Sequence, residues 1–238
     1  MLNELLAGLG QVLLYFVLAA GTAALLRLFT PIPDEPFRKL LHGILLGSLL
    51  IWTLNFRTWW LCALSALGFA GAVYPVLVAL ERWPRYSSFL TERRAGELKS
   101  SLVLVFVMYA AVIAVCWGLA GEKLAALCAI YAWGIGDAAA ALVGKRFGRH
   151  GLTGPHIEGR KSVEGTAAMF AASLVSVLSL LLLRGGMPWY GYVVTSLVTA
   201  AVSATVELFS LRGNDTIFCP LAAMAVLLPL ICLFGGVA

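Results

Sequence analysis

The sequence predicts an all-α, polytopic membrane protein with about eight transmembrane helices, forming one integral membrane domain over residues 1–238. Composition, the spacing of apolar runs and the distribution of basic residues support this prediction. Hydrophobic residues make up 61% of the 238 residues and charged residues 12%, whereas a soluble domain is about half apolar and a quarter charged. The charges are too few to cover a water-exposed globule, which excludes an ordinary soluble enzyme, a disordered chain and a disulfide scaffold.

Eight apolar runs approach the length of about 20 residues that a membrane span needs. The first run is expected to be retained, because no basic residue precedes it as a secretory signal would require. The second run is short, and Trp52 near its end is interpreted, with Trp59 and Trp60, as an anchor at the membrane interface. The runs cover residues 5–28, 40–54, 59–80, 102–120, 124–143, 166–183, 189–208 and 217–234.

The basic residues favour one orientation. Fourteen of the seventeen Lys and Arg residues fall in the first, third, fifth and seventh loops, and only Arg57, Lys123 and Arg184 fall in the others. Because cytoplasmic loops carry the excess of basic residues, both termini are expected outside and the basic loops inside. The predicted location is the cell (inner) membrane, among membrane lipids. The net charge of +5 has the same explanation, so nucleic acid is not an expected partner.

Polar residues near membrane depth are functional candidates, and four groups of them map to the predicted cytoplasmic side. The first group is Arg38, Lys39 and His42, at the entry to the second run. Arg38 and His42 are four residues apart and share a helix face. They form either an anion-binding cluster or a basic pair that reaches the interface beside a hydrogen-bonded histidine.

The second group surrounds Asp137, the only charge in its apolar run. Gly136, Ala140, Gly144 and Gly148 repeat every four residues and form a stripe that lets another helix approach closely. The stripe does not explain Asp137, which would cost about 2.5–3.5 kcal/mol at a helix centre. Asp137 therefore needs a basic side chain, a metal ion or a proton as its partner.

The third group is the glycine-rich, basic segment 144–166, interpreted as a loop that ends at a helix capped by Ser162. Backbone N–H groups at a helix start, with Lys145 and Lys161 nearby, suit a phosphate; the alternative is a solvated basic loop. The segment is not a P-loop, because Arg160 interrupts the pattern before Lys161 and no strand is expected before it.

The fourth group lies near the inner end of the seventh run. Glu207 is followed by Asn214 and Asp215, and two acids with an amide could hold a cation or a polar head group. Alternatively, Glu207 only pairs with Arg212.

The second and third groups together resemble a family. Gly136-Asp137-Ala138 with Gly144 and Gly148, followed by Lys161-Ser162-x-Glu164-Gly165-Thr166, is similar to the pattern of the CTP-dependent polyprenol kinases, which include dolichol kinases, phytol kinases and CTP-dependent diacylglycerol kinases. The resemblance covers residues 38–220.

The resemblance implies roles for individual residues. Asp137, Lys161 and Glu164 would be catalytic, with Asp137 either binding the divalent cation or polarising the acceptor hydroxyl. Mg²⁺ would be the cofactor, with Asp137 and Glu207 as its ligands. The residues that would hold the nucleotide are Gly136, Gly144, Lys145, Gly148, Lys161, Ser162 and Gly165. Those that would line the substrate site are Arg38, Lys39, His42, Asn214 and Asp215.

The predicted activity is transfer of the γ-phosphate of CTP to the hydroxyl of a polyprenol, a phytol-like alcohol or a diacylglycerol at the cytoplasmic interface. Only the resemblance supplies CTP. Two alternatives stay open at this point. One is a phosphatidate cytidylyltransferase, which would make CDP-diacylglycerol. The other is a small-anion transporter with Asp137 as a proton relay, although no inverted repeat is visible.

Overall fold

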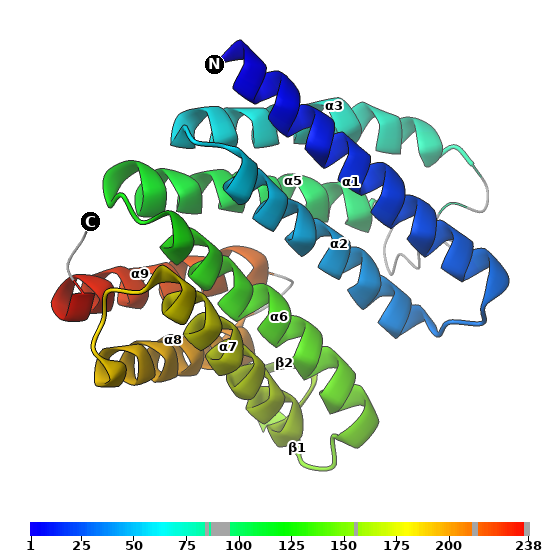
Figure 1. Cartoon of the computed structure of the whole chain (residues 1–238). Coiled ribbons are helices and arrows are strands. Elements are labelled where there is room, and N and C mark those ends of the chain that lie inside the picture. The colour runs from blue at the N-terminus through cyan, green and yellow to red at the C-terminus, as the bar shows by residue number, and fades with distance from the viewer. Residues whose placement is uncertain (84–85, 87–95, 155–156, 211–213, 236–238) are drawn as a thin grey trace. The chain divides into compact units, whose positions relative to one another are not determined.

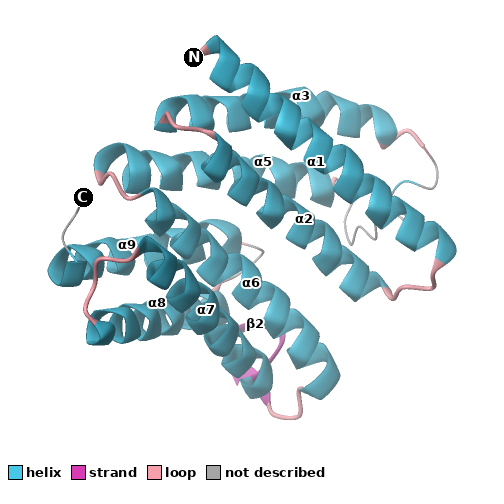
Figure 2. Cartoon of the chain, in the orientation of Figure 1, coloured by secondary structure: helices cyan, strands magenta, loops and turns pink. Residues whose placement is uncertain are grey.

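The computed structural model describes the chain except residues 84–85, 87–95, 155–156, 211–213 and 236–238 and the side chains of residues 158–160 (Figure 1). The described residues contain eight helices long and apolar enough to cross a membrane, which confirms the all-α, eight-span prediction (Figure 2). The helices are α1 (Leu2–Phe29), α2 (Asp34–Asn55), α3 (Trp59–Leu80), α5 (Glu97–Ile113, continued by the π-helix η1, Ala114–Leu119), α6 (Lys123–Phe147), α7 (Val163–Arg184), α8 (Trp189–Phe209) and α9 (Asp215–Gly235).

The helix boundaries differ from the apolar runs where polar residues belong to a helix. α3 has the predicted bounds, but α2 begins six residues before the predicted start at residue 40. Asp34 and Glu35 occupy its first turn, where carboxylates interact favourably with the helix dipole. α6 likewise continues past residue 143 to Phe147, with Lys145 and Arg146 in its last turn. Both extensions carry charge of the sign that stabilises that helix end.

The segment predicted as a basic loop contains a β-hairpin. Strand β1 (Gly151–Gly154) pairs antiparallel with β2 (Ile157–Ser162), with Leu152 opposite Lys161. The expectation that no strand lies before the helix was therefore wrong. The exclusion of a P-loop still holds, because β2 runs directly into α7 at Val163 and leaves no phosphate-binding loop between them.

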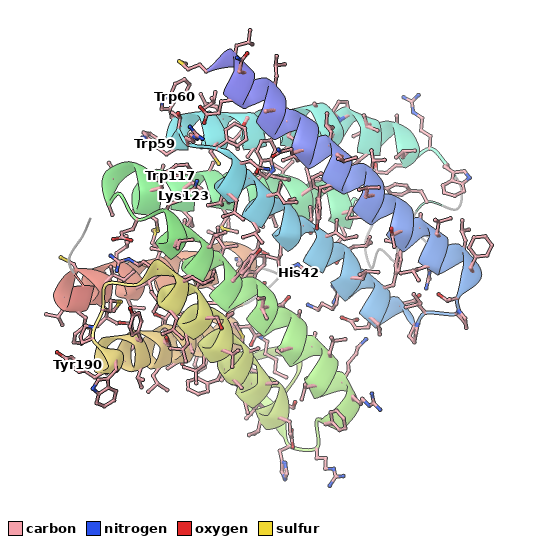
Figure 3. The ribbon with its side chains drawn as sticks, viewed as in Figure 1. His42, Trp59, Trp60, Trp117, Lys123 and Tyr190 are labelled. Atoms are coloured by element: carbon pink, nitrogen blue, oxygen red, sulfur yellow. The ribbon has the colours of Figure 1, made fainter. Side chains whose placement is uncertain are left out.

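The chain divides into two compact units, Met1–Ala111 and Val112–Ala238. In the first unit, α1, α2 and α3 contact one another. The hydroxyl of Tyr109 on α5 lies 2.9 Å from Thr53 Oγ1 on α2 and 3.1 Å from Cys62 Sγ on α3. Trp52 is fully buried and its ring stacks on Phe56. Its interpretation as an interface anchor was therefore wrong, whereas Trp59 and Trp60 are partly exposed at the start of α3 (Figure 3).

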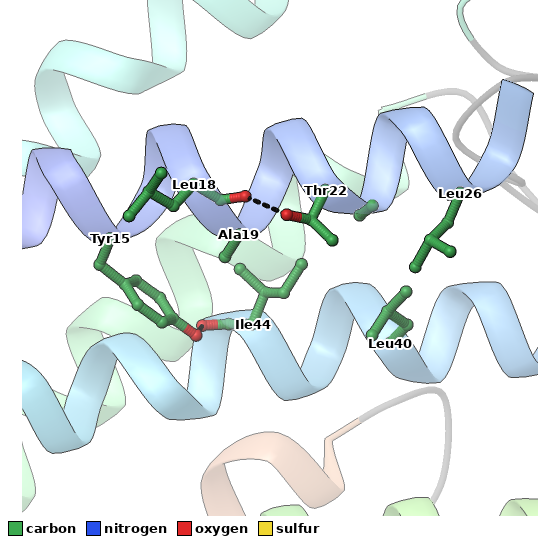
Figure 4. Close-up of a pocket in the computed structure, with 8 residues that line it drawn as sticks. Tyr15, Leu18, Ala19, Thr22, Leu26, Leu40 and Ile44 are labelled. Atoms are coloured by element: carbon green, nitrogen blue, oxygen red, sulfur yellow. Dashed lines mark hydrogen bonds between the residues drawn. The ribbon is translucent and has the colours of Figure 1, made fainter.

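A pocket of about 360 Å³ lies between α1 and α2 in the first unit (Figure 4). Its walls are mainly leucine, isoleucine and alanine side chains. The two hydroxyls that line it bond to backbone oxygens, Tyr15 to Ile44 at 2.8 Å and Thr22 to Leu18 at 2.7 Å. The pocket therefore suits hydrocarbon and offers no charged group to a phosphate, so it is not a candidate for phosphate chemistry.

In the second unit, α6 contacts α7, α8 and α9. The small residues predicted to form a packing stripe serve this purpose on α6. A Cβ atom added to Gly136 would lie 2.5 Å from Ser173 Oγ and 2.9 Å from Met169 Cγ, both on α7. Ser173 also donates to the backbone oxygen of Ala132 at 2.5 Å. Glycine and hydroxyl side chains thus allow α6 and α7 to pack closely, as they do in other membrane helix pairs.

An ion pair links the start of α6 to the end of α7. Arg184, the last residue of α7, donates from Nε to Glu122 Oε2 at 2.7 Å and from Nη2 to Glu122 Oε1. The side chains are 11% and 5% exposed. Glu122 directly precedes α6, and the neighbouring Lys123 lies over the ring of Trp117 at 4.4 Å (Figure 3). The start of α6 and the end of α7 are therefore joined by charge as well as by packing.

Candidate active site

The candidate site lies toward the opposite end of the second unit, where α8 ends and α7 and α9 begin, and it includes Asp137, which lies within α6. Because the four helices follow one another in alternating directions, sequence-distant residues meet there. The acidic residues come from α6, α8 and α9, and the basic residues come from the end of α6 and from the hairpin.

Lys161 on β2 is held by the end of α8. Its Nζ lies 3.0 Å from Glu207 Oε1 and also donates to the backbone oxygens of Glu207 and, at 3.3 Å, of Leu208. The side chains of Lys161 and Glu207 are 19% and 14% exposed. The last carbonyls of a helix carry partial negative charge, so an ammonium group is well placed at this position. Glu207 therefore pairs with Lys161, and Arg212, its partner in the alternative interpretation, lies outside the described residues.

Two further carboxylates lie near Glu207. Asp137 on α6 and Asp215 on α9 are both close enough to Glu207 to interact with it electrostatically. Three carboxylates and one ammonium group carry a formal charge of about −2 when ionised, and like charges in a partly buried site repel one another. A bound cation would reduce this repulsion.

The cation would need ligands from elsewhere as well. Within the described residues, no three His, Cys, Asp or Glu side chains are grouped tightly enough to hold a metal ion. Mg²⁺ commonly binds to one or two carboxylates and takes its other ligands from water and from substrate phosphates. The carboxylates of Asp137 and Glu207 fit that requirement.

Asp215 is held by a residue to which the sequence analysis gave no role. The indole N–H of Trp133 donates to Asp215 Oδ2 at 3.1 Å, across 82 residues of sequence. Trp133 is only 2% exposed and lies one helical turn before Asp137 on α6. The sequence feature that could have identified Trp133 is an aromatic hydrogen-bond donor one turn from an acid within a membrane span.

Ser162 caps α7 as predicted, with its Oγ accepting the N–H of Gly165 at 3.1 Å. Glycines pack around this hydroxyl. A Cβ atom on Gly148 would lie 2.8 Å from Ser162 Oγ, and one on Gly165 would lie 3.2 Å from it and 3.1 Å from the oxygen of Ala140. A Cβ atom on Gly144 would likewise lie 3.5 Å from the Cα atom of Gly165. These glycines bring the end of α6 against the start of α7.

Glu164 points to the hairpin. Its Oε1 lies 2.6 Å from the Nδ1 of His150, and both carboxylate oxygens accept the backbone N–H of His150 at 3.3 Å. The described contacts thus connect the first turn of α7 to the entry of β1. Lys145, by contrast, is exposed on the last turn of α6, beside Arg146 and near Arg149.

The remaining predicted residues have different surroundings. Asn214 is exposed, and its backbone oxygen accepts the N–H groups of Ile217 and Phe218 at the start of α9. Arg38 belongs to the first unit, where it pairs with Glu35 at 2.5 Å and Glu97 at 3.4 Å. Lys39 is partly buried on the same helix, α2. His42, one turn further along α2, is also partly buried (Figure 3).

Comparison with known proteins identifies one clear relative. The chain is 31% identical over 213 residues to the phytol kinase of Synechocystis sp., an alignment that covers 86% of this chain and 83% of that protein. No family model matches the chain. No solved structure matches it either. The identity extends over most of both chains and agrees with the resemblance seen in the central motif, and on this evidence the protein is a multi-pass membrane protein that belongs to the polyprenol and phytol kinase family.

Proposed function

We propose that the protein is a lipid-alcohol kinase that transfers the γ-phosphate of CTP to a phytol-like alcohol, with Mg²⁺ as cofactor. The cluster of Lys161, Glu207, Asp137 and Asp215 carries the proposal, because it joins three carboxylates and an ammonium group from four different elements. A lipid alcohol keeps its tail in the membrane and presents its hydroxyl at this depth. A nucleotide reaches the same place from water.

The chemistry needs positioning and charge neutralisation. A bond forms between the alcohol oxygen and the γ-phosphorus, the bond from that phosphorus to the β–γ bridging oxygen breaks, and CDP leaves. The hydroxyl proton passes to a carboxylate of the cluster or to water. Lys161 and the exposed Lys145 offset the charge on the nucleotide phosphates. Mg²⁺, held by Asp137 and Glu207, would neutralise charge on the transferred group.

The nucleotide would approach from the side that carries the basic residues. Lys145, Arg146 and Arg149 are exposed at this end of the second unit, and basic residues mark the cytoplasmic face of a membrane protein. The proposed site therefore faces the cytoplasm, where nucleotides are available. The name of the relative favours a phytol-like acceptor over a dolichol or a diacylglycerol.

A transfer assay tests the proposal. Purified protein in lipid with Mg²⁺ receives γ-labelled CTP, ATP, GTP or UTP and, separately, phytol, a polyprenol or diacylglycerol. We expect label in the lipid phase with CTP and phytol. Label from α-labelled CTP in phosphatidate would instead identify a cytidylyltransferase. Silence in both arms would contradict both enzyme readings and favour a transporter.

Asp137→Asn is the sharpest variant for this assay. The substitution keeps size and removes the charge, so we expect turnover to fall by at least about 100-fold, the lower range for loss of a positioned acid or base. Asp34→Asn on α2, whose side chain is 78% exposed, is the control and should retain activity. Both variants should insert into the membrane normally. An active Asp137→Asn enzyme would remove Asp137 from the mechanism.

A further inference from the structure

Asp215 occupies a position where a carboxylate has two competing partners. It is the first residue of α9, and an acidic side chain there can turn back toward the unpaired N–H groups of its own helix. Its Oδ2 instead accepts the indole N–H of Trp133 on α6 at 3.1 Å. The Asp215 carboxylate is thereby directed toward α6. It also interacts electrostatically with Glu207 on α8.

Trp133 is well suited to hold a carboxylate in place. The ring is 2% exposed and lies on a helix whose neighbouring residues, including Ala132 and Gly134, are also buried. An indole nitrogen donates one hydrogen bond and accepts none, so it can favour the carboxylate without competing for Lys161. Trp133 also lies one turn from Asp137, so one stretch of α6 carries both an acid of the cluster and the donor to Asp215.

We propose that Trp133 is a positioning residue for the kinase reaction, which sets the orientation of the Asp215 carboxylate in the acidic cluster. The predicted effect on catalysis rests on the proposed function. The hydrogen bond from Trp133 to Asp215 is present in the structure and does not depend on which reaction the protein catalyses. Trp133 acts through Asp215, so the two residues form one functional unit.

The chain provides a matched control. Trp52 is also fully buried in a membrane helix, but its indole nitrogen has no hydrogen-bond partner within the described part of the chain. Trp133→Phe and Trp52→Phe therefore remove the same atoms from comparable surroundings. Only the first substitution removes a hydrogen bond to a carboxylate.

The test compares Trp133→Phe, Asp215→Asn, the double variant and Trp52→Phe in the full chain, with CTP and phytol as substrates. We expect Trp133→Phe to lower kcat at least about tenfold, the loss expected for one hydrogen bond to a charged group. KM for CTP should change less than about threefold, because the nucleotide contacts remain. The double variant should be no slower than Asp215→Asn alone, and Trp52→Phe should keep wild-type kcat.

Two results would overturn the inference in an active enzyme: equal kcat for the Trp133→Phe and Trp52→Phe enzymes, or effects of Trp133→Phe and Asp215→Asn that multiply. A wild-type protein that transfers no phosphate from any nucleotide would instead contradict the proposed function. In that case the coupling between Trp133 and Asp215 is measured from the denaturant midpoints of unfolding of the single and double variants. Non-additive shifts for Trp133→Phe and Asp215→Asn would show the coupling, and additive shifts would refute it.

Discussion

Removing one partner of the ion pair between Glu122 and Arg184 should strongly destabilise the second unit. Both carboxylate oxygens of Glu122 accept hydrogen bonds from the guanidinium, and the two side chains are 5% and 11% exposed. Glu122→Gln removes the carboxylate charge that faces the Arg184 guanidinium. Loss of one partner from a buried pair costs about 3–5 kcal/mol.

The assay is denaturant unfolding in mixed micelles, with Asp34→Asn as the matched control. Asp34 pairs with Arg27 at 2.7 Å, but its side chain is 78% exposed, so this acid-to-amide change should cost less than about 1 kcal/mol. We expect the Glu122→Gln/Arg184→Gln double variant to recover much of the loss, because no buried charge remains. Equal stability of the Glu122→Gln and Asp34→Asn proteins would refute the reasoning.

Two other predictions concern packing and orientation. Gly165→Ala should destabilise the protein by about 1–3 kcal/mol, since the new Cβ atom would lie 3.1 Å from the backbone oxygen of Ala140. The control is Gly68→Ala, whose Cβ atom would have nothing within 4 Å and which should be neutral or slightly stabilising. Denaturant unfolding of the two variants tests this prediction. Single cysteines at Arg57 and Arg149 should be labelled from opposite sides of the membrane, because three predicted spans separate them; labelling of both from one side would contradict the eight-span order.

The membrane spans could be predicted from sequence because the bilayer imposes a length on any apolar helix. That constraint says nothing of polar residues that extend a helix beyond the apolar core. The first turn of α2 at Asp34 and the last turn of α6 at Phe147 were missed for this reason. It also does not say which face of a helix is inside. Trp52 lies near the end of its span but is fully buried.

The hairpin could not be predicted from the pattern of its residues. Strands are recognised by alternation of apolar and polar residues, and β2 contains Ile157 followed by polar or glycine positions up to Ser162. The cap at Ser162 was predictable, because a hydroxyl before a helix has a specific partner a few residues later. Local hydrogen bonding is encoded within a short stretch of sequence, whereas strand pairing depends on surroundings that the stretch does not contain.

The contacts of the candidate site join residues 46 and 82 positions apart, and no local pattern specifies them. What the sequence does specify is on which side of the membrane each end of a span lies. Consecutive membrane helices alternate in direction, so residues near the end of one span and the start of the next meet on the same side. Lys161, directly before α7, and Glu207, near the end of α8, follow this rule within the second unit. Trp133, which contacts Asp215 at the start of α9, instead lies in the middle of α6. The number of spans between two motifs therefore determines which polar residues can meet, and side-chain chemistry then selects the pairs that form.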